Sequence, residues 1–416
     1  MNVIARIKSL LLYPLAYSIV ASQSVIARAK AFGKKPVTHF QKTYAGEKIL
    51  LIALYEKGRL RPDILNLLKT AKVTGLYVVA VNTLKVLQPE DLQDLIDCYI
   101  ERPNFGRDFG SYQTGFMHLF KQGWETKCPR LLMVNDSLFY SKENLAAFLQ
   151  QTINTDIEVL GATENHEIEH HLGSFYISFH ASVLQHIRFK NYWKRYANTD
   201  VRPKVIKRGE MKLSKTLRRC VSSPDQYQAL FDLNWLAEYI SNHEEFLNRV
   251  SDFYRVSDFV DWKRPSLKAA AGRFMKKYLH IAPGLANIEA NIEAKTIYFV
   301  DNPKELIKTV ETSVKESNLQ NLPKRAYEEV KNDLMECFTG GSQIHQNGIL
   351  LHHLGLPIIK LDALYRGMFS VADVEKLTDQ LSSDEKQHFR KLMFSKPYGG
   401  NTLFGWKRSA FYRGLI

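Results

Sequence analysis

Three polar segments of this chain have residue types and spacings suited to binding an anion or moving a proton. The first, residues 102–112, lies between an expected short strand and an expected helix. Gly106 permits close approach of the backbone to a ligand, and the start of the helix offers free N–H groups to an anion. Arg107 can pair with a phosphate, while Asp108 can accept a hydrogen bond from a ribose or sugar hydroxyl. A helix capped by the aspartate, with a solvated arginine beside it, is the alternative explanation of this segment.

The second segment places oxygen-bearing side chains directly after the apolar residues 131–134. These side chains belong to Asn135, Asp136 and Ser137. Ligands of open α/β sheets bind at the carboxyl ends of the strands. Hard cations prefer oxygen ligands, so Asp136 could hold a divalent cation, Mg or Mn, that bridges a nucleotide diphosphate. An ordinary Asn-Asp turn that caps a helix is the alternative.

The third segment, residues 161–171, contains the His-Glu-x-x-His spacing of zinc proteases. Zinc hydrolysis would require His166 and His170 to lie on one face of a stable helix. The segment is short, polar and flanked by glycines between two expected strands, which favours a loop. We therefore expect a polar loop at the strand ends, with His171 best placed because it is nearest the next strand. A zinc-dependent hydrolase remains the less favoured alternative.

Strands and helices alternate in the pattern from residue 48 onward, and they would position these segments. Repeated strand–helix units of this length predict a mainly parallel sheet with helices on both faces. The expected strands are residues 49–55, 76–82, 100–101, 131–134, 157–161 and 174–179, with one more at 297–300. The expected helices are residues 61–73, 89–99, 109–121, 142–153, 303–316 and 322–338. The fold class is thus α/β, with a core domain at residues 47–222 and a mostly helical C-terminal extension at residues 223–416.

Composition sets the broad class of the protein. The chain has 416 residues, of which 45% are hydrophobic and 24% charged, as in ordinary globular proteins. Its four cysteines are scattered, which argues against a disulfide framework and fits a reducing compartment. A formal net charge of +14 attracts polyanions such as nucleic acid, anionic lipid or phosphorylated substrates. No helix-turn-helix, zinc-finger or RNA-recognition signature is present, so binding to nucleic acid is the weaker of these explanations.

Residues 1–46 form a separate basic N-terminal segment. Val3, Ile4, Ile7, Leu10 and Leu11 recur at helical spacing, with basic residues between and after them. The apolar run is short for a transmembrane helix, which needs roughly 20 apolar residues. We expect an amphipathic helix that lies on an anionic membrane surface, which gives a cytoplasmic protein peripheral to the inner face of the membrane. A helix packed on the protein's own core and a cleaved signal peptide are the alternatives.

Taken together, the motifs resemble the rhamnan synthesis protein F family. The resemblance lies in Asn-Phe-Gly-Arg-Asp-Phe-Gly-Ser-Tyr at residues 104–112, Val-Asn-Asp-Ser at 134–137 and His-Leu-Gly-Ser-Phe-Tyr-Ile-Ser-Phe at 171–179. It continues through residues 205–214, returns weakly at His345 and at residues 355–360, and departs from the family at Gly173. The family implies a GT-A-like, Rossmann-type fold. It also implies a glycosyltransferase of bacterial surface polysaccharide synthesis, such as that of O-antigen lipopolysaccharide.

The resemblance also implies roles for particular residues. Glu210 would be the base of an inverting transfer, and Asp136 would act with it and hold the metal ion. His345 and Lys360 would lie on the acceptor or diphosphate side. The residues expected to bind the nucleotide sugar are Asn104, Gly106, Arg107, Asp108, Ser111, Asn135, Ser137 and His171. The alternative for Glu210 is a glutamate in the first turn of a helix, favoured there by the helix dipole.

The reaction expected from the resemblance moves rhamnose or another hexose from a nucleotide-diphosphate donor. The acceptor would be a lipid-linked oligosaccharide or a growing glycan. The sequence leaves open the donor sugar, the acceptor linkage, inversion against retention, metal dependence and the oligomeric state. A non-catalytic glycan-binding or scaffold protein with the same fold is the main rival.

Overall fold

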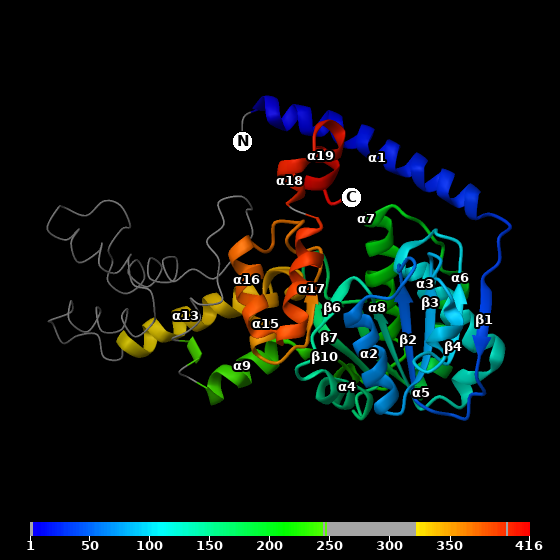
Figure 1. Cartoon of the computed structure of the whole chain (residues 1–416). Helices are drawn as coiled ribbons and strands as arrows, with labels where there is room; N and C mark the ends of the chain where they lie inside the picture. Colours follow the sequence, from blue (N-terminus) through cyan, green and yellow to red (C-terminus); the bar gives the residue numbers. More distant parts are fainter. Residues whose placement is uncertain (1–2, 244–245, 248–321, 397) are drawn as a thin grey trace, which may run out of the picture. The chain divides into compact units, whose positions relative to one another are not determined.

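The structure of this protein is a computed structural model that describes residues 3–243, 246–247, 322–396 and 398–416 (Figure 1). The chain divides into two compact units. The first comprises Met1–Glu164, Glu169–Leu230 and Leu351–Ile416. The second comprises Asn165–Ile168 and Phe231–Leu350. The domain boundaries predicted at residues 46 and 222 stay predictions. Residues 351–416, from the predicted C-terminal extension, belong to the same unit as the central sheet.

A central sheet organises the first unit. In the part of the chain that the structure describes, nine strands form this sheet in the order β1-β4-β3-β2-β5-β9-β7-β10, with β8 paired to β7. The inner pairs β4–β3, β3–β2 and β2–β5 are parallel, whereas β1–β4, β5–β9 and β9–β7 are antiparallel. The strands are β1 (Val37–Gln41), β2 (Ile49–Leu54), β3 (Tyr77–Asn82), β4 (Cys98–Glu101), β5 (Arg130–Asn135), β7 (Val159–Asn165), β8 (His171–Leu172), β9 (Tyr176–His180) and β10 (Tyr227–Phe231). The predicted α/β fold is confirmed, with a large sheet whose central pairs are the predicted parallel ones.

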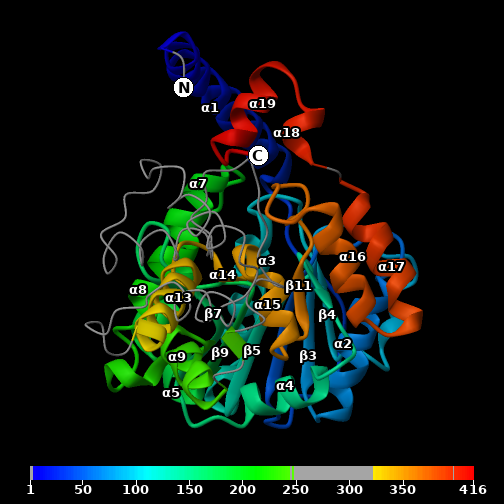
Figure 2. The same ribbon diagram turned by 90° about the vertical axis from the view of Figure 1, so that its left-hand side faces the viewer.

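Helices cover both faces of the sheet (Figure 2). On one face, Leu51 joins Phe116 of α3 (Arg107–Gln122) and Trp193 of α6 (Ile187–Arg195) in a large hydrophobic cluster. Successive side chains of a strand point to opposite faces, so Leu50 and Ile52 are buried on the other face. On that face α2 (Pro62–Val73) packs against β3 and α4 (Leu145–Ile153) packs against β5. Burial on both faces explains why the inner strands are apolar at nearly every position.

The remaining elements of the first unit surround this sheet. Its described helices are α1 (Val3–Ala31), α2 (Pro62–Val73), α3 (Arg107–Gln122), α4 (Leu145–Ile153), α5 (Ala181–Gln185), α6 (Ile187–Arg195), α7 (Arg202–Val205), α8 (Lys212–Leu217), α16 (Val371–Gln380), α17 (Ser383–Phe394), α18 (Gly399–Thr402) and α19 (Gly405–Tyr412). The 3-10 helical turns are η1 (Pro89–Leu92), η2 (Trp124–Thr126) and η4 (Pro224–Gln226), and η3 (Ile206–Met211) is a π-helical turn. A separate two-stranded antiparallel sheet joins β6 (Leu138–Tyr140) to β11 (Ile358–Lys360).

The helix predicted at residues 89–99 is wrong. Only η1 (Pro89–Leu92) is helical there, and β4 begins at Cys98. Cys98 and Tyr99 are buried in parallel pairing with Val79 and Ala80 of β3. Pairing in the sheet therefore outweighs the helical preference of the preceding residues.

The described part of the second unit consists mainly of helices, together with the loop residues 166–168 and the last residues of β7 and β10. Its helices are α9 (Leu233–Asn242), α13 (Leu322–Phe338) and α14 (Gln343–Gln346), and α15 (Gly348–His353) crosses into the first unit. The predicted helix at residues 322–338 is confirmed by α13. The strand predicted at residues 297–300 and the helix predicted at residues 303–316 lie outside the described residues.

The N-terminal segment folds as the long helix α1 (Val3–Ala31), which contains Pro14. Its residues Ala16, Val20 and Ser24 are buried. Ala16 packs against α19 in a small cluster at the C-terminal end of the chain. One face of α1 thus packs on the protein itself, which is the alternative that the sequence left open. Among the described residues, no helix has both the length and the apolar character needed to cross a membrane.

Candidate active site at the carboxyl ends of the parallel strands

Asp136 lies at the edge of the sheet where parallel strands end together. It directly follows β5, and its backbone N–H donates to the carbonyl of Ala53 in β2 over 3.1 Å. Its carboxylate accepts a hydrogen bond from the backbone N–H of Tyr55, the residue after β2. Because β2 and β5 are parallel, their carboxyl ends fix this carboxylate at one edge of the sheet.

The first and second polar segments meet at this edge. Asn135 donates from its side-chain amide to Oδ2 of Asp108 over 3.1 Å. The oxygen of the same amide accepts from the Ser137 hydroxyl over 2.6 Å, which fixes the orientation of the amide. Asn104 reaches the hydroxyl of Tyr55 over 3.5 Å. The structure therefore brings together Asn104, Asp108, Asn135, Asp136 and Ser137, as the sequence predicted.

Buried Arg102 organises the loop that leads into α3. It donates to the Ser111 hydroxyl over 2.8 Å and to the backbone carbonyls of Pro103, Phe105 and Arg107. Gly106 has φ of 97°, and a Cβ there would lie 2.5 Å from Oδ1 of Asn198. Ser111 and Gly106 thus serve the packing of this loop. The contact with Asn198 explains why position 106 requires glycine.

Lys360 enters the site from a distant part of the chain. In β11 it lies opposite Leu138 of β6, which places it beside the turn after β5. Its Nζ donates to the Ser137 hydroxyl over 2.7 Å and lies 5.4 Å from the centre of the Phe175 ring. The positive charge of Lys360 opposes the effect of burial on the pKa of Asp108, although burial prevails and that pKa is raised.

Glu210 and His171 form a second group beside Lys360. Nε2 of His171 lies 3.6 Å from Oε2 of Glu210, and the Ser174 hydroxyl donates to Oε1 of Glu210 over 3.2 Å. Burial alone would raise the pKa of Glu210, but His171, Lys360 and Arg202 outweigh it and lower that pKa. Burial alone would lower the pKa of His171, but Glu210 and the backbone carbonyl of Glu169 raise it. The pair therefore favours an ionised glutamate beside a protonated histidine.

Two buried carboxyl groups at the strand ends have strongly raised pKa values. Burial, with the nearby charge of Asp108, raises the pKa of Asp136 to about 7. Burial raises the pKa of Glu56 to about 7, although the charge of Arg61 opposes it. Arg61 donates to the Asp136 carbonyl over 2.9 Å and pairs with both carboxylate oxygens of Asp63. A cationic ligand at this edge would therefore relieve an unfavourable negative charge.

Two arginines that the sequence did not single out, Arg202 and Arg366, lie near Arg107, and Arg202 also lies near Glu210. Arg202 of α7 donates to the Gly414 carbonyl over 3.2 Å, and Arg366 donates to the Ile416 carbonyl over 3.4 Å. Burial, followed by the like charge of Arg366, lowers the pKa of Arg202 to about 10, and Arg107 adds to this effect. The three guanidinium groups are near enough to repel one another, so an anion among them would be stabilised.

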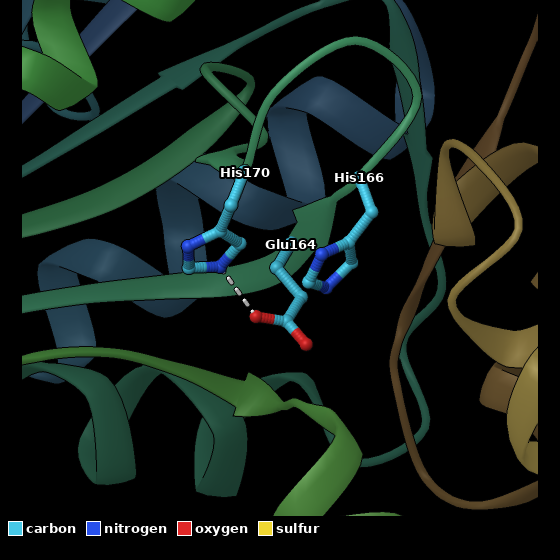
Figure 3. Close-up of side chains that lie close together, drawn as sticks. All are labelled: Glu164, His166 and His170. Atoms are coloured by element: carbon cyan, nitrogen blue, oxygen red, sulfur yellow. Dashed lines mark hydrogen bonds and ion pairs between the residues drawn. The ribbon is translucent and has the colours of Figure 1, made fainter.

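The His-Glu-x-x-His segment is not a helix. It runs from the end of β7 through a loop to β8, so the two histidines do not share a helical face and the zinc-protease geometry is absent. Glu164, His166 and His170 nevertheless offer ligand atoms within 4.8 Å of one another (Figure 3). Nε2 of His170 lies 2.6 Å from Glu164, while Arg218 donates to Nδ1 of His170 over 2.7 Å. Since Nδ1 accepts, the ring proton lies on Nε2 toward the carboxylate, which disfavours a metal ion there.

His345 lies in the second unit. Its Nδ1 is 2.9 Å from the hydroxyl of Ser342, the residue that precedes α14. The predicted role of His345 on the acceptor or diphosphate side stays a prediction.

Comparison with known proteins identifies the family. The rhamnan synthesis protein F family matches residues 76–333, which is more than half of the chain. This chain belongs to the rhamnan synthesis protein F family. The matched region contains the strand-end residues of β5, the loop before α3 and the Glu210 group, while Lys360 and Arg366 lie beyond it.

Two curated relatives of this rhamnan synthesis family member match shorter regions. An uncharacterised protein y4gN of Sinorhizobium fredii is 29% identical over 192 residues, covering 45% of this chain and 48% of the relative. The virulence protein VirA of Vibrio anguillarum is 30% identical over 132 residues, covering 31% of this chain and 41% of the relative. The chain thus spans about half the length of the curated relatives it matches, or less.

Among solved structures, the glycosyltransferase GlyE of Streptococcus pneumoniae TIGR4 is similar at a low level. The two chains share 11% identity over 66% of each, with a TM-score of 0.27. A likeness this weak says nothing of the activity of this chain.

Proposed function

We propose that this chain is a glycosyltransferase of polysaccharide synthesis that uses a nucleotide-diphosphate sugar. The observation that carries the proposal is the hydrogen bond of 3.1 Å between Asn135 and Asp108, which joins two polar segments at the carboxyl end of a parallel sheet. This is the edge at which nucleotides bind in open α/β folds. The family name, rhamnan synthesis, supports a sugar as the transferred group.

The donor would be held through its ribose and its diphosphate. Asp108 and Asn104 can accept or donate hydrogen bonds to hydroxyls of the nucleotide or sugar. Arg107, Arg202 and Lys360 supply positive charge for the diphosphate, which gains negative charge as the sugar leaves. This arrangement would stabilise the transition state more than the bound donor, which is the requirement for catalysis.

A divalent cation, Mg or Mn, fits the acidic side of this site. Asp136 would hold it, with Asp108 nearby, since magnesium in nucleotide sites is bound by one or two carboxylates and by substrate phosphates. Burial and the nearby charge of Asp108 raise the pKa of Asp136 to about 7, so a cation beside this carboxylate would favour its ionised form. When bound, the cation would neutralise charge on the leaving diphosphate.

Glu210 is proposed as the general base. Its lowered pKa keeps the carboxylate ionised near neutral pH, and Ser174 and His171 orient it. An acceptor hydroxyl would attack the anomeric carbon of the sugar while Glu210 takes its proton. The bond between that carbon and the diphosphate oxygen breaks, and the nucleoside diphosphate leaves. Attack opposite the leaving group inverts the anomeric centre.

The acceptor is proposed to be a lipid-linked oligosaccharide or a growing surface glycan, such as O-antigen. A lipid-linked acceptor places the reaction at the inner face of the cytoplasmic membrane. The transferred sugar is rhamnose from its deoxythymidine diphosphate donor by the family expectation, and another hexose is the alternative. Binding to nucleic acid forms no part of the proposal.

A panel of nucleotide sugars tests the proposal at the level of binding. Thermal unfolding of the full chain would be followed with each donor, with the free nucleoside diphosphate and with the free sugar, each with and without Mg²⁺ or Mn²⁺. We expect stabilisation by one donor and by its nucleoside diphosphate, but not by the free sugar. Stabilisation by free glycans alone would instead support a non-catalytic glycan-binding protein.

A further inference from the structure

The positive charge of this chain is concentrated in two segments. Residues 1–46 and 386–416 contain 14 Lys and Arg residues, and neither segment contains Asp or Glu. The remaining 43 Lys and Arg residues are matched by 43 Asp and Glu residues, so the rest of the chain is neutral. The formal net charge of +14 is therefore the charge of these two segments alone.

The two segments are joined in the structure. Ala16 of α1 packs with Ala410 of α19 and with Leu415, and all three are buried. Arg413 lies 5.7 Å from the centre of the Tyr13 ring, which is a cation–π contact. Figure 1 shows α19 (red) against α1 (blue). The basic residues of α1 and α19 thus belong to one part of the first unit.

Helix α1 also has an exposed apolar face. Leu12, Leu15 and Ile26 are exposed, and their separations of three and eleven residues place them on one side of the helix. Phe32, just after the helix, is 86% exposed. The buried face of α1 is already used in packing on α19, so this second face has no role in the core.

The C-terminal segment repeats the combination of exposed rings and cations. Phe404 is 77% exposed and Tyr412 is 55% exposed, at the two ends of α19. Lys407, Arg408 and Arg413 are exposed on the same helix or just after it. Exposed aromatic and aliphatic side chains among basic residues are typical of helices that lie in the headgroup region of a bilayer.

We propose that α1 and α19 together form one docking surface for an anionic lipid bilayer. We call it the terminal docking surface, defined by Leu12, Leu15, Ile26, Arg28, Lys30, Phe32, Lys34, Lys35, Phe404, Lys407, Arg408, Tyr412 and Arg413. The inference extends the proposed membrane location and adds α19, which the sequence did not connect with the membrane. It is tested without any sugar donor, so its failure is distinguishable from failure of the proposed sugar transfer.

A bilayer fits this surface better than nucleic acid does. Nucleic acid would use the cations but would leave the aliphatic side chains of Leu15 and Ile26 in water. A bilayer satisfies both features, since anionic headgroups attract the cations while the apolar side chains enter the boundary with the acyl chains.

The docking surface is also linked to the candidate site. The carbonyls of Gly414 and Ile416, which follow α19, accept hydrogen bonds from Arg202 and Arg366. A bilayer that binds α19 would therefore hold the proposed diphosphate-binding arginines close to a lipid-linked acceptor.

Vesicle flotation of the full chain tests the inference. Binding would be measured on phosphatidylcholine vesicles with and without phosphatidylglycerol. The double variant Lys407→Gln, Arg408→Gln removes two exposed charges of the surface. The matched control, Lys121→Gln with Lys127→Gln, removes two exposed lysines from the neutral remainder of the chain. Each basic residue near an anionic surface contributes roughly fivefold to binding, so we expect roughly 25-fold weaker binding for the first variant. The control should bind like the wild type.

A second variant separates the apolar contribution from the charge. Phe32→Ser with Phe404→Ser should abolish the binding that survives high salt, because exposed charges are screened over about 3 Å at 1 M salt. The proposal would be overturned if the Lys407→Gln, Arg408→Gln variant bound vesicles as well as the wild type does. It would also be overturned if the control variant lost as much binding as that variant. If double-stranded DNA displaced the protein from the vesicles at a concentration below that of the anionic lipid, the surface would be assigned to nucleic acid instead.

Discussion

Asn135 donates its side-chain amide to the carboxylate of Asp108 over 3.1 Å, and this contact joins the end of β5 to the first turn of α3. The amide cannot rotate freely, because its oxygen accepts from both the backbone N–H and the hydroxyl of Ser137. Nζ of Lys360 donates a hydrogen bond to the same hydroxyl. Four residues from three parts of the chain are thus coupled, and a change at one of them should disturb the others.

Asp136→Asn should separate activity from stability. The pKa of Asp136 is raised from 3.8 to about 7, so the folded protein binds this proton more tightly than the unfolded chain does. Its contribution to stability is complete below pH 4 and is lost as the pH rises through 7. Asparagine imitates the protonated form. At pH 8 we therefore expect the free energy of unfolding of the variant to exceed that of the wild type by roughly 1 to 3 kcal/mol, which thermal unfolding would measure. Sugar transfer should fall at least about 100-fold.

Glu56→Gln is the matched control for this variant. Its pKa is also raised to about 7 by burial, so the same gain in stability above neutral pH is expected. Glu56 is not proposed to hold the donor, so transfer should remain within about tenfold of the wild type. Full transfer activity of the Asp136 variant would remove that residue from the proposed site.

Glu210→Gln should affect the chemical step. A positioned general base contributes typically 10²- to 10⁴-fold, so kcat should fall by about that range while KM for the donor changes little. Ser174→Ala removes only one hydrogen bond to the carboxylate and should cost much less. Unchanged kcat in the Glu210 variant would favour the alternative that this residue is a structural glutamate.

Arg202→Gln should weaken binding of the diphosphate in particular. A hydrogen bond to a charged group is worth about 1.5–3 kcal/mol, which is a loss of about 10- to 100-fold in affinity. The loss should appear for the nucleoside diphosphate and be nearly absent for the free nucleoside, as measured by calorimetry. Arg390→Gln breaks an exposed ion pair with Glu375 and serves as control. An equal loss for nucleoside and diphosphate would indicate that Arg202 only supports the fold.

Protein purified without a histidine tag should contain no stoichiometric zinc. The contact between Arg218 and Nδ1 of His170 directs the ring proton toward Glu164 rather than leaving a lone pair there. Metal analysis of the wild type and of His166→Ala, His170→Ala checks this. One zinc per chain in the wild type, lost in the double variant, would overturn the prediction.

Local patterns predict most of the sheet and the residues at its carboxyl edge. The strands at residues 131–134 and 49–55 are apolar runs that end in polar residues, and parallel pairing brings such ends together. The amino-acid pattern is therefore enough to group Asn135, Asp136 and Asp108 in one site. The helix predicted at residues 89–99 is wrong because β4 is specified by its partner β3, which no local window contains.

The arginines of the site could not be predicted in this way. Arg366 is near Arg202 because the segment after α19 contacts both side chains, across more than 150 residues of sequence. The same holds for the packing of α1 on α19, which depends on Ala16 and Ala410. The concentration of charge in the two terminal segments is visible in the sequence, but its meaning depends on their contact.

The most direct test of the proposed sugar transfer is turnover of a nucleotide sugar by the full chain. The donor that stabilises the protein would be incubated with wild type, Asp136→Asn and Glu210→Gln, with a lipid-linked or short soluble glycan acceptor and a divalent cation. Release of nucleoside diphosphate and formation of the glycosylated acceptor would be measured together. We predict equal amounts of both products with the wild type and at least about 100-fold less with either variant. Turnover that is equal in all three folded proteins would contradict the proposed transfer, as would the absence of turnover of every donor by folded wild type.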